Sequence, residues 1–100
     1  MSAGAEEYDG RMLTMLQLIW GEGFLSPGGA QAVREIVAGI SLDGRRVLDI
    51  GCGLGGLDQV LAGLGDCHVT GIDVAQPLVA LAKARIAKAG LEKRIDFRAY

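Results

Sequence analysis

The sequence predicts an α/β fold built on a parallel sheet. Three short segments, at residues 45–50, 68–73 and 94–99, have the length of strands, and the first, with Val47, Leu48 and Ile50, suits a buried parallel strand. Two further segments with apolar residues at helical spacing separate them. The resulting order of strand, helix, strand, helix and strand indicates parallel strands joined by right-handed crossovers. We expect helices to cover both faces of this sheet.

Two further helices are predicted ahead of the first strand. The earlier one, over residues 10–20, is amphipathic, and its expected buried face consists of Met12, Met15, Leu16 and Ile19. Glycines interrupt the pattern after it, and Ser26 followed by Pro27 predicts an N-cap and first turn for the second helix. That helix is expected to end between residues 39 and 42, with a buried face of Val33, Ile36, Val37 and Ile40.

The remaining elements follow from turn residues and periodicity. Asp43-Gly44 predicts a turn before the first strand, and the glycine-rich segment 51–56 follows that strand. The next helix is expected to end at Gly65, with Leu57, Val60, Leu61 and Leu64 on one face. After the second strand, Pro77 opens a helix that Gly90 closes, and its expected face comprises Val79, Ala82, Ile86 and Ala89.

Composition limits the classes of function. The chain has 100 residues, of which 50% are hydrophobic and 22% charged, as expected for one packed domain. A net charge of −2 argues against a nucleic-acid partner. The apolar stretch near the start is too short to span a bilayer, so no membrane association is expected. Cys52 and Cys67 lack C-x-x-C spacing, which predicts no metal site and favours a reducing, cytoplasmic location.

The glycine-rich segment is the main candidate for function. Ligands of open α/β sheets bind beyond the carboxyl ends of the strands, where this segment lies. Gly51 and Gly53 would let a ligand approach the main chain, and the Asp73 carboxylate, at the end of the second strand, can accept ribose hydroxyls. Because Gly51, Gly53 and Gly56 also fit the dinucleotide fingerprint, the spacing alone leaves NAD and S-adenosylmethionine as equal candidates.

Two motifs resemble a known family. Residues 47–56, V-L-D-I-G-C-G-L-G-G, and residues 71–74, G-I-D-V, are similar to the cofactor motifs of class I S-adenosylmethionine-dependent methyltransferases, which have a Rossmann-like fold. The resemblance implies that S-adenosylmethionine is the cofactor. It also implies one role for each matching position: Asp49 holds the methionine amino group, Gly51 and Gly53 approach the methionine part, Asp73 binds the ribose and Val74 packs on adenine.

The segment upstream narrows this resemblance. Residues 19–29, I-W-G-E-G-F-L-S-P-G-G, are similar to the corresponding stretch of phosphoethanolamine and related small-amine N-methyltransferases. The likeness implies that residues 1–44 form a helical lid and residues 45–100 the first half of the cofactor-binding domain. It assigns cofactor contacts to Leu25 and Ser26, and the catalytic tyrosine to Tyr8. A tyrosine with an ordinary pKa near 10 is a poor base, so we expect Tyr8 to orient the amine.

The sequence therefore predicts an enzyme that transfers a methyl group to nitrogen of a small amine resembling phosphoethanolamine. The alternatives are an NAD-dependent oxidoreductase and a non-catalytic nucleotide-binding module. Class I methyltransferases have more strands than the three predicted here, so we expect the second half of the fold to be absent. The first strand would then lie at an exposed edge, and the isolated chain is expected to self-associate there and to have little or no turnover.

Overall fold

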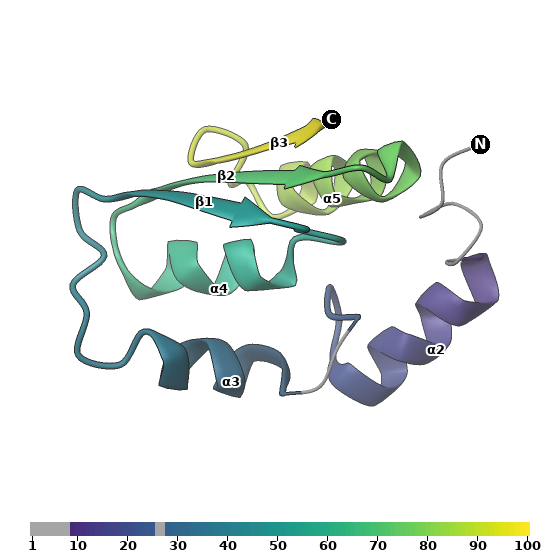
Figure 1. The fold of residues 1–100 in the computed structure, drawn as a ribbon, viewed down its shortest axis with the longest axis horizontal. Helices are drawn as coiled ribbons and strands as arrows, with labels where there is room; N and C mark the ends of the chain where they lie inside the picture. Colours follow the sequence, from purple (N-terminus) through teal and green to yellow (C-terminus); the bar gives the residue numbers. More distant parts are fainter. Residues whose placement is uncertain (1–8, 26–27) are drawn as a thin grey trace.

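The computed structural model describes residues 9–25 and 28–100. In these residues a three-stranded sheet is connected by two helices, and two further helices precede it in the chain (Figure 1). In chain order the elements are α2 (Gly10–Trp20), α3 (Gly29–Ile36), β1 (Arg46–Ile50), α4 (Gly56–Leu64), β2 (His68–Asp73), α5 (Gln76–Lys88) and β3 (Ile95–Ala99). The predicted α/β fold with a parallel sheet is confirmed.

The three strands are parallel and lie in the order β1-β2-β3. In the register, Asp49 of β1 is opposite Gly71 of β2, and Gly71 is opposite Phe97 of β3. The carboxyl ends of all three strands therefore lie at the same end of the sheet, and the glycine-rich segment follows β1 at that end. Both β1 and β3 begin one residue later than the sequence pattern predicts.

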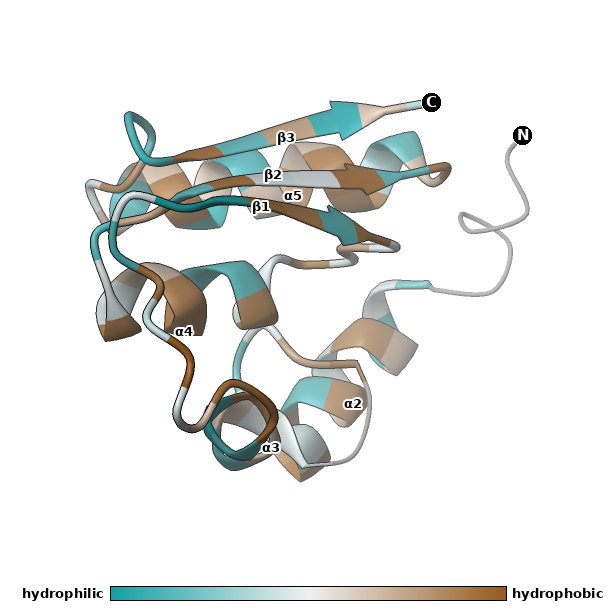
Figure 2. Cartoon of the chain, turned by 60° about the vertical axis from the view of Figure 1, so that its left-hand side comes forward, coloured by the Kyte–Doolittle hydropathy of each residue, from teal (hydrophilic) through white to brown (hydrophobic). Residues whose placement is uncertain are grey.

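The expectation of helices on both faces is wrong for the described residues. Helices α4 and α5 pack on the same face of the sheet (Figures 1 and 2). Two right-handed crossovers that step in the same direction along a sheet place both helices on one side. The core on that side joins residues from both helices and from the strands, namely Leu61, Ala62, Val69, Val79, Ala82, Ile86, Ile95 and Phe97.

The opposite face of the sheet is partly apolar and open. Leu48 and Ile50 of β1 point to this side and are 59% and 68% exposed. Asp49, between them, points to the side of the helices. The outer edge of β1 pairs with no other described strand. This edge and its two apolar side chains form the most exposed apolar part of the sheet.

Helix α2 has the predicted bounds but a different buried face. Asp9 caps it by accepting a hydrogen bond from the Met12 N–H at 2.8 Å. Three of the side chains predicted to be buried, Met12, Met15 and Ile19, are between 40% and 58% exposed. Leu16 is half-buried as predicted, and the other half-buried residues are Leu13, Gln17 and Trp20. Nearly every side of this helix carries an apolar residue, so its periodicity could not select the packed one. Within the described part of the chain, no helix is long and apolar enough to cross a membrane.

Helix α3 begins later and ends earlier than predicted. Its N-cap is Gly28, not Ser26, and its last residue is Ile36, followed by a turn. Val33 is buried in the core and Val37 packs against that core. Ile36 and Ile40, which were predicted to share this face, are 73% and 58% exposed. The turn after Ile36 ends the helical spacing, so residues 33–40 do not form one continuous face.

The last two helices follow the prediction with smaller differences. Leu57, Val60 and Leu61 of α4 pack in or against the core, whereas Leu64 is 44% exposed. Helix α5 begins at Gln76, one residue before Pro77, and ends at Lys88. Ala89, predicted to share its buried face, is the exposed C-cap, and Leu78 is buried instead.

Candidate functional site

The glycine-rich segment forms a tight turn between β1 and α4. The N–H groups of Gly51 and Cys52 both donate to the carbonyl of Ile72, at 2.7 and 3.0 Å, which ties the turn to β2. Gly51 and Gly53 have φ values of +80° and +55°, a region that side chains disfavour. A Cβ on Gly51 would meet no atom within 4 Å. The main chain at Gly51 is thus open to a ligand, as the sequence analysis predicts.

Asp73 faces this turn. Its carboxylate accepts hydrogen bonds from the Gly53 N–H at 3.0 Å and from the Ala75 N–H at 2.9 Å. The side chain is half-buried, and each oxygen can accept a further hydrogen bond because a carboxylate oxygen has two acceptor positions. Asp73 therefore both fixes the turn and presents free acceptor capacity beside Gly51. This arrangement can bind two neighbouring hydroxyl groups, as on a ribose.

Leu25 reaches the turn from the segment after α2. Its Cδ1 atom lies 3.5 Å from the position of a Cβ on Gly53. Leu25 also packs against a small buried cluster formed by Leu54, Ala75 and Leu78. The structure thus places Leu25 at the predicted site, whereas Ser26 and Tyr8 lie outside the described residues. Their predicted roles, and that of Leu25 as a cofactor contact, stay predictions.

Asp49 and Val74 complete the set of predicted residues. Asp49 is half-buried and is the penultimate residue of β1, two residues before Gly51. Val74 follows Asp73 directly and is 49% exposed, so its side chain is free to cover a flat apolar group. The fold gathers Asp49, Gly51, Gly53, Asp73 and Val74 at the carboxyl ends of β1 and β2. Their roles toward a ligand stay predictions.

A second acid, Asp58, lies in the first turn of α4 and was missed by the sequence analysis. It is fully buried, and neither of its carboxyl oxygens has a hydrogen-bond partner of acceptable geometry. Burial, together with the smaller effect of the nearby Asp49 side chain, raises the pKa of Asp58 from 3.8 to about 9. At neutral pH Asp58 is therefore protonated. Its spacing of three and four residues from the buried Leu61 and Ala62 was the signal that could have placed it in the core.

Cys52 has an inert thiol. Its side chain is buried, and burial, with the charges of Asp58, Asp73 and Asp49, raises its pKa to about 12. The protonated thiol is a poor nucleophile. Cys52 is therefore a small buried residue that fills space beside the turn. Among residues 9–25 and 28–100, no three His, Cys, Asp or Glu side chains are grouped closely enough to hold a metal ion.

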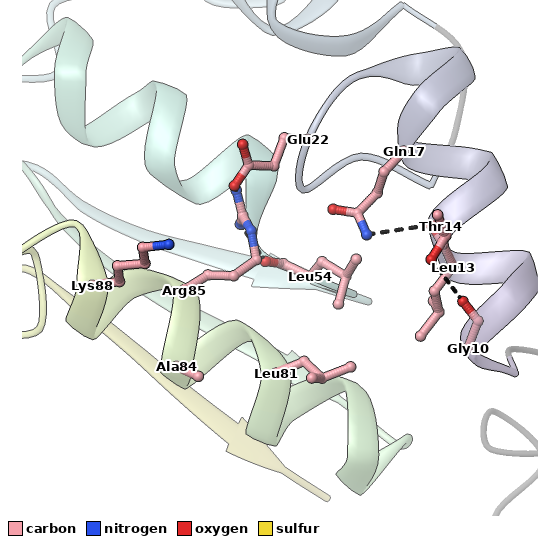
Figure 3. A pocket seen from close by; sticks show the side chains of 10 residues that line it. All are labelled: Gly10, Leu13, Thr14, Gln17, Glu22, Leu54, Leu81, Ala84, Arg85 and Lys88. Atoms are coloured by element: carbon pink, nitrogen blue, oxygen red, sulfur yellow. Dashed lines mark hydrogen bonds and ion pairs between the residues drawn. The ribbon is translucent and has the colours of Figure 1, made fainter.

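A cavity of about 510 Å³ lies between α2 and α5 (Figure 3). Leu54 is the only residue of the glycine-rich segment that lines it, and none of the predicted cofactor contacts that the structure describes does. Arg85 reaches across this space from α5 toward Leu54 and Glu22. Arg85 lies in a helix whose cations would be expected to face solvent, but its side chain is only 19% exposed. Periodicity could not reveal these contacts, because Leu54 and Glu22 are both far from Arg85 in the sequence.

Fold and site together define an α/β domain with a nucleoside-type binding turn and one acid on the neighbouring strand. The sequence profile of the family described as "Methyltransferase domain" matches residues 47–100. This match covers more than half of the chain and includes β1, the glycine turn and Asp73. The chain therefore belongs to the methyltransferase domain family.

Individual relatives extend the likeness ahead of β1. Phosphoethanolamine N-methyltransferase 1 of Arabidopsis thaliana is 35% identical over 92 residues, covering 91% of this chain but 18% of that protein. Ubiquinone biosynthesis O-methyltransferase of Stutzerimonas stutzeri is 44% identical over 59 residues, covering 59% of this chain and 24% of that protein. The chain thus spans less than a quarter of the length of these relatives.

A solved structure agrees with the sequence relatives. Phosphoethanolamine N-methyltransferase 2 of Haemonchus contortus, in complex with phosphomonomethylethanolamine and S-adenosylhomocysteine, superposes with a TM-score of 0.79 at 28% identity. The superposition covers 93% of this chain and 22% of the other. The similarity therefore includes most of the region ahead of β1 as well as the sheet.

Proposed function

We propose that this chain carries the cofactor-binding part of an S-adenosylmethionine-dependent methyltransferase. The observation on which this depends is the Asp73 carboxylate, which is bonded to the Gly53 N–H while retaining acceptor capacity beside the open main chain at Gly51. The residues present fit an adenosine derivative: a ribose can bind Asp73, and its extension can run along Gly51 toward Asp49. Bound S-adenosylmethionine supplies a methyl group activated on a sulfonium ion.

The residues of the chain would then act by positioning. Asp73 would hold the ribose, and the Asp49 side chain, at the carboxyl end of β1, would accept a hydrogen bond from the methionine ammonium. Leu25, which packs over Gly53, would exclude water from the main chain of the turn. Alignment of this kind can contribute about 7–11 kcal/mol to a displacement reaction. We propose, from the family likeness, that residues 1–44 act as a lid and that Tyr8 orients the acceptor amine.

A small amine is the proposed acceptor, and a phosphoethanolamine-like molecule is the specific candidate. The support is that the likeness to phosphoethanolamine N-methyltransferase covers 91% of the chain, whereas the likeness to the O-methyltransferase covers 59%. The full gene product that carries this sequence should methylate phosphoethanolamine in a radiolabel assay. Transfer to a catechol hydroxyl in preference to any amine would reject this acceptor.

Calorimetry tests the cofactor. We expect S-adenosylhomocysteine to bind this chain and NAD to show no heat of binding at the same concentrations. NAD binding without S-adenosylhomocysteine binding would favour the oxidoreductase alternative. Binding of S-adenosylhomocysteine together with absence of methyl transfer by the full gene product would favour a non-catalytic module.

We also propose self-association through the free edge of β1. The unpaired edge and the exposed Leu48 and Ile50 are the support, because open apolar edges pair with other strands. Sedimentation velocity should show an oligomer that grows with concentration, and Leu48→Lys should shift the protein to monomer. Leu18→Lys is the control, since Leu18 on α2 is 82% exposed and away from the edge. An equal effect of both substitutions would contradict an edge-specific contact.

A cytoplasmic location is proposed on the two thiols. Cys52 and Cys67 are both free and buried, and free buried thiols are usual in reducing compartments. Fractionation of cells that express the full gene product should recover it with cytoplasmic markers. Recovery with a membrane or secreted fraction would reject this location.

A further inference from the structure

Arg85 connects three segments that are distant in the sequence. From α5, its Nη1 donates to the Leu54 carbonyl in the glycine turn at 2.7 Å, and its Nη2 donates to Oε1 of Gln59 on α4 at 3.1 Å. The Glu22 carboxylate, in the segment after α2, lies 3.9 Å from the same Nη2 (Figure 3). The Arg85 side chain is 19% exposed, so its contacts with Leu54 and Gln59 are shielded, whereas the Glu22 side chain is 86% exposed and its ion pair is open to water.

The segment Gly21–Leu25 is fastened to the glycine turn at the same place. The Gly56 N–H donates to the Gly23 carbonyl at 3.0 Å, and the Gly23 N–H donates to Oε1 of Gln17 at 2.8 Å. A Cβ on Gly23 would lie 2.5–2.6 Å from three atoms of the Arg85 guanidinium. The guanidinium therefore packs directly on the main chain of Gly23 while it holds the carbonyl of Leu54.

We propose that Arg85 is a positioning residue that fastens the segment Gly21–Leu25 to the glycine turn and thereby sets the affinity of the turn for its ligand. The inference rests on the proposed function only for the identity of that ligand. Without the guanidinium, the Leu54 carbonyl and the Gln59 amide lose their donor, and Gly23 loses the group packed on it. Leu25, two residues further on, would then cover Gly53 less of the time.

Arg94 provides a matched control within the same chain. Its Nη2 donates to the carbonyls of Gly65 and Cys67 at 2.6 and 3.3 Å, and its Nε lies 3.9 Å from the Asp66 carboxylate. These contacts repeat the chemistry of Arg85 at the opposite, amino-terminal end of the sheet. Loss of Arg94 should therefore cost comparable stability without touching the turn.

The experiment compares Arg85→Met, Arg85→Lys and Arg94→Met by amide hydrogen exchange in the ligand-free chain. In Arg85→Met we expect exchange at the Gly23 and Gly56 amides to rise about tenfold or more, with β1–β2 amides unchanged. Arg85→Lys keeps the positive charge but lacks the planar guanidinium with its several donors. It should therefore restore slow exchange at these amides only partly. Arg94→Met should leave both at the wild-type rate.

Titration with S-adenosylhomocysteine completes the test. Arg85→Met should weaken binding by about tenfold relative to Arg94→Met, because the ligand must then order the segment itself. Equal exchange at Gly23 and Gly56 in the two methionine variants, or equal affinities, would overturn the inference. The wild-type chain could bind no S-adenosylhomocysteine while Arg85→Met alone speeds exchange at the Gly23 and Gly56 amides. That result would support the fastening role of Arg85 and reject the proposed function.

Discussion

Replacing Asp73 with asparagine is expected to weaken binding of S-adenosylhomocysteine by about 10- to 100-fold. A hydrogen bond to a charged acceptor contributes roughly 1.5–3 kcal/mol, and the neutral amide cannot accept from both ribose hydroxyls. In wild type the two Asp73 oxygens accept hydrogen bonds from the Gly53 and Ala75 N–H groups. The asparagine side chain would place its NH2 group against one of these backbone donors. Calorimetry on the folded variant measures the loss, and Asp96→Asn on the neighbouring strand is the control.

A second ligand separates ribose recognition from damage to the turn. Wild-type protein should bind adenosine more tightly than 2′-deoxyadenosine, and Asp73→Asn should bind the two with nearly the same affinity. A turn distorted by the substitution would instead weaken both ligands by the same factor and preserve their ratio. An unchanged ratio would place the ribose away from Asp73 and remove the main support for the proposed function.

The position of Asp73 could be predicted from sequence because it depends on short, local signals. Each strand is a segment of five or six residues in which apolar residues recur, and parallel order brings the ends of β1 and β2 together. The glycine turn and its acid therefore follow from chain order. Placing both helices on one face also follows from two right-handed crossovers, although the sequence analysis did not apply that rule to this strand order.

The missed features depend on tertiary contacts. Helix α2 is apolar on nearly all sides, so packing of Leu13 against Leu54, Ala75 and Leu78 selects its buried face. The sequence around Arg85 does not distinguish it from a surface cation, because its environment is set by the tertiary contacts with Leu54 and Glu22. Asp58 has the spacing of a core residue but the chemistry of a surface one. In each case the chain segments that decide the environment lie far apart in sequence.

Asp58→Asn is expected to change how stability depends on pH. The folded-state pKa of about 9 lies above the ordinary value of 3.8, so the folded form retains a proton that the unfolded chain loses. The stability from this group is fully present below about pH 4 and is lost as pH rises toward 9, at up to about 1.4 kcal/mol per pH unit. Asparagine cannot ionise, which removes this slope.

The two stability curves should therefore cross. The asparagine amide has two N–H donors where the protonated carboxyl has one O–H, and an additional buried donor without a partner costs about 1–3 kcal/mol at every pH, so the variant should be the less stable protein at pH 5. By pH 8 the cost of keeping Asp58 protonated exceeds this penalty, and the variant should be the more stable one. Urea unfolding at pH 5, 6, 7 and 8 measures the crossing, and Asp66→Asn, at a side chain 94% exposed, should run parallel to wild type.

The result also assigns the charge beside the turn. If Asp58 holds its proton to about pH 9, it adds no charge beside the turn at neutral pH, and it is not an acceptor for an ammonium group there. Parallel curves for Asp58→Asn and wild type would show that Asp58 ionises normally despite its burial. Asp58 would then be a second candidate, beside Asp49, for the acceptor of the methionine end of the ligand.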